Sequence, residues 1–375
     1  MKIGLLLPRS VIYSSMAFDI VDGLKACFKK TGENNHEIIS ASIGVAGKNQ
    51  DIYARCEQLL LDGADIIVGY MNPLSAEFIH PLFESSGKLL LVLDTGYHFP
   101  SFEGNLSNAY FISLQGNLCC RAIIRKAIEN GKQDFAFTCS LYDAGYRPSY
   151  TYAAAIEESG ATLGYNHVTP LHRADFTLKP LAEYLENNKN TALLASFCGD
   201  MAEDFFKEAK KLNLIASHKT YVSGFTAEEE WLSKIPYPGH NFDCAVAWSV
   251  AIDTPENEEF VQIMENIKPN KSNLFSLLGW EAALFITASE GKSFEGITID
   301  SPRGRVYMNP ENRFTDAPIF YATVVKNAQT GNCLLADITK IENLDEERNR
   351  IKNDIAFIQN TTANSWLNAY ACLDS

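Results

Sequence analysis

The feature that most constrains this chain is a regular alternation of short apolar runs with stretches of helical periodicity. Apolar runs of strand length occupy 3–7, 38–43, 66–68 and 89–93, and helical spacing of apolar residues follows the first three. Parallel strands need a crossover of a dozen or more residues, which is usually a helix. This order therefore predicts an α/β fold with a doubly wound parallel sheet.

The same alternation begins again after residue 115. Strands are predicted at 135–139, 163–168, 192–197 and 220–222, with helices between them. The segments MNPLSAEFIHPLFESSGK and CGDMAEDFFKEAKKLNL each follow a strand, open with a turn and run Ala-Glu into a helix that carries an aromatic residue. The chain is therefore expected to form two similar lobes, each with its own sheet.

The last part of the chain breaks this pattern. Two helices are predicted at 257–267 and 273–289, and the segment 299–327 then reads as an antiparallel ribbon with turn chemistry at Gly304 and Asn309. A strand-like run at 333–338 follows. A charged helix is expected from 344 to about 367, most simply packed on its own lobe through an apolar face that consists of Ile351, Ile355 and Ile358.

Composition and charge limit the classes of function. The 375 residues are 46% hydrophobic, with a net charge of −14 that disfavours binding to nucleic acid or to anionic membrane surfaces. The apolar run after Met1 is too short for a signal peptide, and the nine scattered cysteines suggest free thiols. We therefore expect a cytoplasmic protein, or a periplasmic one if a signal peptide has been trimmed, with no direct insertion into a membrane.

Enzyme signatures are missing from the sequence. The SEGKS stretch at 289–293 follows a helix and lacks the glycine spacing of a phosphate-binding loop. There is no His-Glu-x-x-His, Cys-x-x-Cys or Gly-x-Ser-x-Gly motif, and the seven histidines are spread along the chain. We predict no catalytic residues, no metal site and no cofactor.

The loops after the strands are the candidate binding loops, because ligands of open α/β sheets sit beyond the carboxyl ends of the strands. These loops are rich in hydroxyl and aromatic groups, which can hold a polar head and cover an apolar body. The alternative is that they cap helices or fill lobe edges. The predicted ligand-binding residues are Ser14, Tyr70, Asn72, Ser75, Asp94, Thr95, Tyr97, Tyr146, Phe197 and Phe225.

Asp94 is the most specific of these candidates. It ends a fully apolar strand, where a carboxylate is costly unless it meets a cation or hydrogen-bond donors. A cationic group of a ligand would satisfy it, and so would a local backbone turn.

The sequence resembles the type I periplasmic binding proteins, in the branch of leucine/isoleucine/valine-binding and amide- or urea-binding receptors. The resemblance covers about residues 2–340 and rests on KIGLLLP, CEQLLLDGADIIVGYMNPLSAEFIHPLFESSGKLLLV, LYDAGYRPSYTYAAAIEESGATL and the late segment IDSPRGRVYMNPENRFTDAPIFYATV. It implies two Rossmann-like lobes joined by a three-strand hinge. Lobe one would be 1–116 with 250–322, lobe two 117–249 with 323–340, and 341–375 a helical extension.

The resemblance also implies a function and roles for residues. Ser75 and Thr95 match positions that hold a ligand's polar head, and Tyr146 matches the aromatic residue that covers it. The chain departs from the family at Leu93-Asp94 and at the tetrapeptide 146–149, where members often have Tyr-Gly-x-Gly. The implied function is capture of an amino acid or amide in an interlobe cleft by hinge closure, without catalysis, for an ABC-type permease. The alternative is a cytoplasmic sensor that signals to a regulatory protein.

Overall fold

The computed structural model describes residues 1–33, 35–45, 47–100, 106–140, 148–170, 172–269 and 271–359. The chain forms two compact units. Unit 1 contains Met1–Leu114 and Ile252–Pro318, and unit 2 contains Gln115–Ala251 and the described residues from Ile319 onward. Within the described residues the chain thus passes between the units three times, after Leu114, Ala251 and Pro318, and we call these passages links 1, 2 and 3.

Unit 1 is built on a five-stranded parallel sheet with the order β2-β1-β3-β4-β5. Its strands are β1 (Lys2–Pro8), β2 (Glu37–Gly44), β3 (Ile66–Tyr70), β4 (Leu89–Asp94) and β5 (Ala109–Ser113). The doubly wound fold predicted from the alternating pattern is confirmed. Strand β5, with the sequence AYFIS, was not among the strands identified from the sequence.

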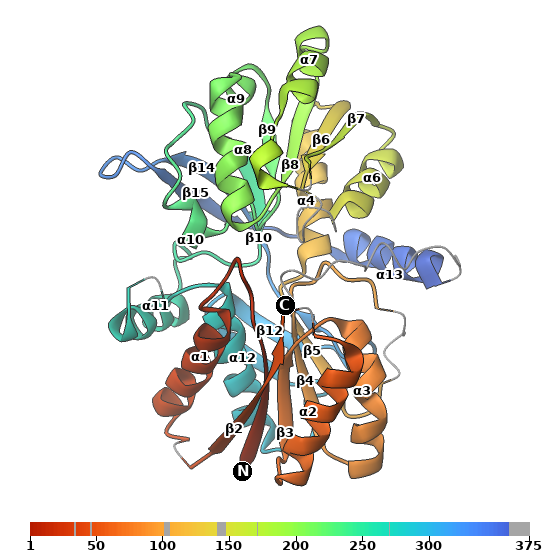
Figure 1. Cartoon of the computed structure of the whole chain (residues 1–375), viewed down its shortest axis with the longest axis vertical. Coiled ribbons are helices and arrows are strands. Elements are labelled where there is room, and N and C mark those ends of the chain that lie inside the picture. Colours follow the sequence, from red (N-terminus) through yellow and green to blue (C-terminus); the bar gives the residue numbers. More distant parts are fainter. Residues whose placement is uncertain are drawn as a thin grey trace. The chain divides into compact units, whose positions relative to one another are not determined.

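Helices cover both faces of this sheet (Figure 1). They are α1 (Met16–Thr31), α2 (Asn49–Leu61), α3 (Pro73–Ser86), α11 (Pro255–Ile267) and α12 (Leu274–Ser289). Helices α2 and α3 bury a core with Leu6, Ile67 and Val92 of the sheet, whereas α1 and α12 pack against each other on the other face.

Two glycines allow α1 and α12 to approach closely. A Cβ atom at Gly23 of α1 would lie 2.0 Å from the carbonyl oxygen of Ser276, and one at Gly279 of α12 would lie 2.0 Å from that of Ile20. The backbones therefore touch where any side chain would clash. This contact joins the first helix of the chain to one that follows about 250 residues later.

The late ribbon belongs to unit 1. Strands β11 (Thr298–Ser301), β12 (Gly304–Met308) and β13 (Thr315–Asp316) form a three-stranded antiparallel sheet. Gly304 has φ +99°, which suits the tight β11–β12 turn. The ribbon bonds to the edge of the main sheet, because the Ser113 N–H donates to the Thr315 hydroxyl at 2.9 Å.

Unit 2 repeats the strand order of unit 1. Its parallel strands run β7-β6-β8-β9-β10, and the antiparallel strands β14 and β15 extend the sheet beyond β10. The bounds are β6 (Asp134–Cys139), β7 (Thr162–Val168), β8 (Ala192–Ser196), β9 (Thr220–Val222), β10 (Phe242–Val246), β14 (Phe320–Lys326) and β15 (Cys333–Lys340). Numbered from β6, this is the same order 2-1-3-4-5, so the repeat predicted from the two similar segments is confirmed.

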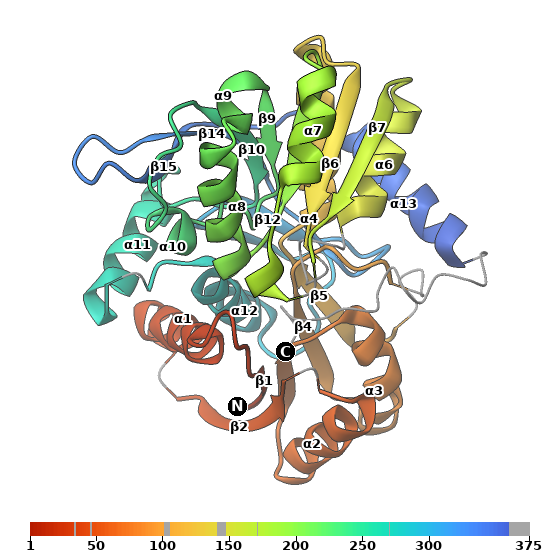
Figure 2. The ribbon, with the colours of Figure 1, turned by 45° about the horizontal axis from the view of Figure 1, so that its top comes forward.

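The helices of unit 2 lie on both faces of its sheet (Figure 2). They are α4 (Gly116–Glu129), α6 (Pro148–Glu158), the 3₁₀ turn η1 (Arg173–Asp175), α7 (Lys179–Asn187), α8 (Gly199–Lys211), α9 (Leu214–Ser217), α10 (Glu229–Leu232) and α13 (Asp345–Gln359). Helix α4 packs with α6 and α13, and α8 with α9 and α10.

The structure differs from the sequence expectation at link 3. The sequence placed residues up to 322 in lobe one, whereas the chain enters unit 2 at Ile319. The reason is strand pairing, since Phe320 already pairs with Val246 of β10. The described part of the C-terminal extension, α13, also belongs to unit 2.

Helix α13 packs through acidic groups, which corrects the expected isoleucine face. Its buried residues are Glu347 and Asp354, whereas Ile351, Ile355 and Ile358 are only half-buried. Asp354 pairs with the buried Arg121 of α4 at 2.6 Å. The helix is therefore held by ion pairs that periodicity of apolar residues does not show.

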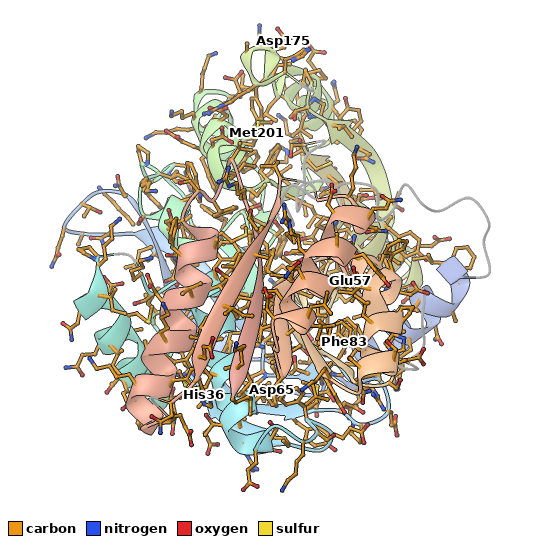
Figure 3. All side chains as sticks on the ribbon, turned by 60° about the horizontal axis from the view of Figure 1, so that its bottom comes forward. His36, Glu57, Asp65, Phe83, Asp175 and Met201 are labelled. Carbon is orange, nitrogen blue, oxygen red and sulfur yellow. The ribbon has the colours of Figure 1, made fainter. Side chains whose placement is uncertain are left out.

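The amino-terminal edge of the first sheet carries structural ion pairs. Asp65 accepts a hydrogen bond from the Lys2 backbone N–H at 2.9 Å and pairs with Lys88 at 2.9 Å. Figure 3 labels Asp65 and His36 at this edge. These contacts join β1, β3 and β4 at the edge opposite the candidate binding loops.

Every cysteine among the described residues, eight in all, is a buried free thiol, and Cys372 lies outside the described residues. Burial raises the pKa of Cys27 and of Cys56 to about 12, so these thiols stay protonated and pack as small apolar groups. Within the described ranges, no helix has the length and apolar character needed to cross a membrane.

Candidate functional site

The strand order places a candidate site in each unit. In a sheet with the order 2-1-3-4-5, the first and third strands carry their crossovers on opposite faces, and ligands bind beyond the carboxyl ends at this switch point. In unit 1 the switch point lies between β1 and β3, and in unit 2 between β6 and β8. The carboxyl edge of each sheet is therefore where the sequence-predicted residues have to be placed.

An aromatic cluster lies at the switch point of unit 1. Tyr13 follows β1 and Tyr70 ends β3, and both rings meet Phe275 edge-on, with centroid separations of 5.1 Å and 5.9 Å. Phe275 was missed by sequence reasoning, because it lies in the first turn of α12, about 200 residues after Tyr70. We call Tyr13, Tyr70 and Phe275 the aromatic triad. Ser14 beside it is exposed.

The start of α3 is internally satisfied. The Asn72 side chain caps the helix by accepting a hydrogen bond from the Leu74 N–H at 2.9 Å, and the Ser75 N–H donates to the Asn72 carbonyl at 2.9 Å. The Ser75 hydroxyl donates to the Asn49 side chain at 2.9 Å. Asn72 and Ser75 thus lie together at the start of α3, and the polar groups described here serve the helix end. What remains for a ligand is the positive end of the helix dipole.

Asp94 is held by its own turn. One carboxylate oxygen accepts a hydrogen bond from the Gly96 N–H at 2.9 Å, and the other lies 3.0 Å from Nδ1 of His98. Asp94 is 3% exposed and His98 is buried as well. The sequence left two possible partners for the Asp94 carboxylate, a cationic group of a ligand or a local backbone turn. The structure shows the local turn, and it adds His98, which was not predicted from the sequence as a partner of Asp94.

Thr95 is a buried polar residue at this edge whose hydroxyl is not satisfied by the described residues. Its side chain is 1% exposed, and its hydroxyl has no hydrogen-bond partner among the described residues. A buried hydroxyl without a partner is costly, and such groups in folded proteins call for a ligand, a water or a strain explanation. Tyr97, two residues later, is buried in the same loop.

The second-lobe candidates divide into two groups. Tyr146 lies outside the described residues. Phe197 and Phe225 lie at the carboxyl edge of the second sheet and are buried. The Phe197 ring stacks on Phe205 at 5.0 Å, and its backbone N–H donates to the Thr226 hydroxyl at 2.8 Å. Phe197 thus packs in the core of unit 2.

Two glutamates at the same edge of unit 2 were not predicted. Glu228 caps α10 by accepting hydrogen bonds from the Glu230 and Trp231 N–H groups. Glu229 accepts from the Ser249 hydroxyl and the Val250 N–H, both at 2.9 Å, just before link 2. Burial raises the pKa of Glu228 to about 8 and that of Glu229 to about 7, so both carry protons more readily than ordinary glutamates.

A buried ion pair supports the β5 end of the first sheet. Arg303 and Glu281 are both fully buried, with contacts of 2.7 Å and 2.8 Å between guanidinium and carboxylate. The Ser301 hydroxyl donates to Glu281 at 2.6 Å, and Nη2 of Arg303 donates to the Ser113 carbonyl at 3.0 Å. Nη1 of Arg303 has no partner among the described residues. Ser113 directly precedes link 1, so this pair fixes the backbone there.

The described residues contain no group of three or more His, Cys, Asp or Glu side chains arranged to hold a metal ion. At the carboxyl edge of unit 1, the groups present are hydroxyl, aromatic and guanidinium groups next to carboxylates that already have partners. Groups of this kind can bind and orient a small molecule.

Comparison with known proteins identifies a family of binding proteins. A family model described as periplasmic binding protein matches residues 1–329. Comparison with curated proteins gives no match.

Solved structures share the fold at low sequence identity. An ABC transporter substrate-binding protein from Sphaerobacter thermophilus has a TM-score of 0.76 at 15% identity, covering 91% of this chain and 98% of that one. A solute-binding protein of an ABC transporter from Rhodopseudomonas palustris, in complex with 3,4-dihydroxybenzoic acid, has a TM-score of 0.73 at 17% identity, covering 92% and 99%. An ABC-type branched-chain amino acid transporter protein from the same species has a TM-score of 0.70 at 17% identity, covering 91% and 96%.

Proposed function

Because the chain belongs to the periplasmic binding protein family, we propose that it is a solute-binding protein that captures a small organic molecule for an ABC-type transporter. The proposal includes binding without catalysis. It also includes closure of the two units on the solute by hinge motion, as the sequence resemblance implies.

The observation that carries the proposal is the buried hydroxyl of Thr95. It stands directly beyond the carboxyl end of β4, beside the loop after β3, where an α/β sheet binds its ligands. Its hydroxyl has no partner among the described residues, so an oxygen or nitrogen atom of a solute would satisfy it. The sequence resemblance independently matched Thr95 to a position that holds a ligand's polar head.

The other predicted residues take supporting places in the proposal. Tyr70 and Tyr97 of unit 1 would border the solute, with Asn72 and Ser75 holding the start of α3 in place. Tyr146 and Phe225 of unit 2 would cover it. An amino acid or an amide is the ligand class that the resemblance implies.

A solute screen tests this function. Thermal unfolding of the whole protein is followed with amino acids, amides, urea, aliphatic and aromatic acids, and short peptides, because a solute that binds only the folded state raises the melting temperature. A solute at about 100 times its dissociation constant adds about 2.7 kcal/mol. If no solute in a broad library shifts the transition, the proposed function is wrong.

The variant Thr95→Val then locates the site. It keeps the shape of the side chain and removes the hydroxyl, so the affinity for the identified solute should fall by about two- to tenfold, since a hydrogen bond contributes about 0.5–1.5 kcal/mol. Thr287→Val is the matched control, because the Thr287 hydroxyl also lacks a partner among the described residues but lies in the last turn of α12. Calorimetry that gives equal losses for both variants would place the site elsewhere.

Location is part of the proposal. A transport receptor works outside the cytoplasmic membrane, and fractionation of cells that make the natural protein tests this. The cytoplasmic regulator considered from the sequence has no support among the reported relatives, which are transport proteins by their descriptions. We do not propose it.

A further inference from the structure

A buried carboxylate in the first turn of α1 joins two segments of unit 1 that are far apart in the sequence. It belongs to Asp19, which is 1% exposed. Resting on the proposed function, we infer that Asp19 is a positioning residue of the candidate site. It ties the loop after β1 to the first turn of α12, and so fixes Tyr13 and Phe275 of the aromatic triad against each other. Asp19 acts through these residues and does not itself have to touch the solute.

Three hydrogen-bond donors converge on the Asp19 carboxylate. One oxygen accepts from the Ser15 hydroxyl at 2.7 Å and from the Asn273 side-chain amide at 3.0 Å. The other oxygen accepts from the Lys271 ammonium group at 2.5 Å. Lys271 also pairs with Asp22 at 2.8 Å. A buried carboxylate with these partners is held in one place, because the loss of any contact leaves a buried polar group unsatisfied.

Asn273 passes this restraint to the first turn of α12. Its side-chain oxygen caps the helix by accepting from the Phe275 N–H at 3.1 Å and from the Ser276 N–H at 3.0 Å. The Ser276 hydroxyl accepts in return from the Asn273 N–H at 3.0 Å, which completes a capping box. The first turn of α12, with Phe275 in it, is thus tied to Asp19, which lies 254 residues before Asn273.

The other end of the restraint holds the loop after β1. Ser15 stands two residues after Tyr13, and its carbonyl accepts from the Asp19 N–H at 2.9 Å while its hydroxyl bonds to the Asp19 carboxylate. The Tyr13 and Phe275 rings meet with a centroid separation of 5.1 Å, so Asp19 holds the backbone on both sides of this ring contact. Without the carboxylate, the two rings should lose their fixed separation.

The alternative role for Asp19 is simply to join α1 to α12. These helices lie side by side (Figure 1), and their backbones already touch at Gly23 and Gly279. The pairing of the two helices therefore does not depend on a carboxylate at their ends. The placement of the loop after β1 and of the first turn of α12 does.

Fluorine NMR of the whole protein tests the restraint without any solute. The protein is labelled with 4-fluorophenylalanine, and Phe275→Leu assigns the Phe275 signal. Asp19→Asn keeps the size of the side chain but leaves one oxygen for three donors, so the Phe275 signal should shift or broaden. Asp65→Asn is the matched control, because Asp65 bonds to a lysine and a backbone N–H at the opposite edge of the same sheet. An unchanged Phe275 signal in Asp19→Asn overturns the inference.

Calorimetry with the solute that the screen identifies tests the consequence for binding. Asp19→Asn should weaken binding by about two- to tenfold, which is what the loss of one well-placed aromatic contact costs. Asp65→Asn should leave the affinity unchanged. Combining Asp19→Asn with Asn273→Asp should restore most of the affinity, because a carboxylate and an amide again face each other and aspartate caps a helix as well as asparagine does. Ser15→Ala removes a single donor and serves as the milder variant if Asp19→Asn does not fold.

The outcomes separate the inference from the function on which it rests. If the parent binds a solute and both Asp19→Asn and Ser15→Ala bind it as tightly, the inference is overturned and the proposed function stands. Equal losses in Asp19→Asn and Asp65→Asn would mean that affinity follows the stability of unit 1, which also overturns the inference. If no solute in the broad library binds, the proposed function fails and the inference falls with it. A shifted Phe275 signal would then show a structural tie only.

Discussion

Replacement of Glu281 by glutamine should destabilise unit 1 far more than the loss of an ordinary ion pair. Glu281 and Arg303 are both fully buried, and the carboxylate accepts from Ser301 at 2.6 Å and from Arg303 at 2.7 Å and 2.8 Å. In Glu281→Gln, the amide nitrogen cannot accept from the guanidinium, and the positive charge of Arg303 stays buried without compensation. Breaking a buried pair in this way costs about 3–5 kcal/mol.

The matched control is Glu295→Gln in the same ribbon region. Glu295 pairs with Arg313 at 2.7 Å, but its side chain is 41% exposed, so the loss should be below about 1 kcal/mol. The assay is urea unfolding followed by circular dichroism, with hydrogen exchange of residues 298–316 to locate the effect. A buried ion pair can often be replaced by apolar groups of similar volume without loss of stability. The double variant Glu281→Met with Arg303→Met should therefore recover most of the unfolding free energy that Glu281→Gln loses.

Two results would refute this reasoning. One is a loss in Glu281→Gln no larger than in Glu295→Gln, which would mean that Arg303 reaches solvent or another partner. The other is an increase of hydrogen exchange in unit 2 of Glu281→Gln while exchange in the ribbon, residues 298–316, stays unchanged. The contacts of Arg303, including the bond from Nη2 to the Ser113 carbonyl, lie within unit 1, so the effect is expected there.

Two further predictions concern unit 2. Asp354→Ala should lower the free energy of unfolding of unit 2 by about 1–3 kcal/mol, since it leaves the buried Arg121 short of a partner. The control Glu346→Ala removes the exposed pair with Arg350 and should change the urea midpoint little. Equal shifts of the midpoint in the two variants would show that α13 is not held by the buried pair. Glu228 has a folded-state pKa of about 8 against 4.5 in the unfolded chain, so its contribution to stability is complete below about pH 4.5 and is lost as the pH rises to about 8, by up to about 1.4 kcal/mol per pH unit. Glu228→Gln should therefore gain stability over the parent between pH 5 and pH 8 in urea titrations, and a difference that is the same at both pH values would contradict the raised pKa.

Much of the fold follows from local pattern. The alternation of strand runs and helical spacing predicted two doubly wound sheets, because the period of a buried strand and that of an amphipathic helix are visible in any short window. The likeness of the segments that form α3 and α8 predicted the repeat, and both helices follow the third strand of their sheets. The second sheet's last two strands were placed less well, since β14 pairs with β10 through residues about 75–80 positions apart, and β15 is added to the sheet only by pairing with β14.

The site was less accessible to sequence reasoning. Asp94 and Thr95 were found, since a polar pair after a fully apolar strand is visible in sequence. The partner of Asp94 was not, because the contact with His98 depends on the turn at Gly96. Phe275 and Arg303 reach the first sheet from more than 150 residues away, and no local pattern reports such a contact.

The same limit applies to α13. Its isoleucines suggested an apolar face, yet the helix buries Glu347 and Asp354. The basic partners Arg125 and Arg121 lie on α4, more than 200 residues earlier in the chain. The burial of an acidic residue can be predicted only when its basic partner is known, because a buried charge needs such a partner.

The most direct test of the central claim is a crystal structure of the protein with the solute identified by the screen. The account predicts an oxygen or nitrogen atom of that solute about 2.5–3.2 Å from the Thr95 hydroxyl oxygen, beyond the carboxyl end of β4. A solute bound at the amino-terminal edge of the sheet, or one that leaves the Thr95 hydroxyl without a partner, would contradict it.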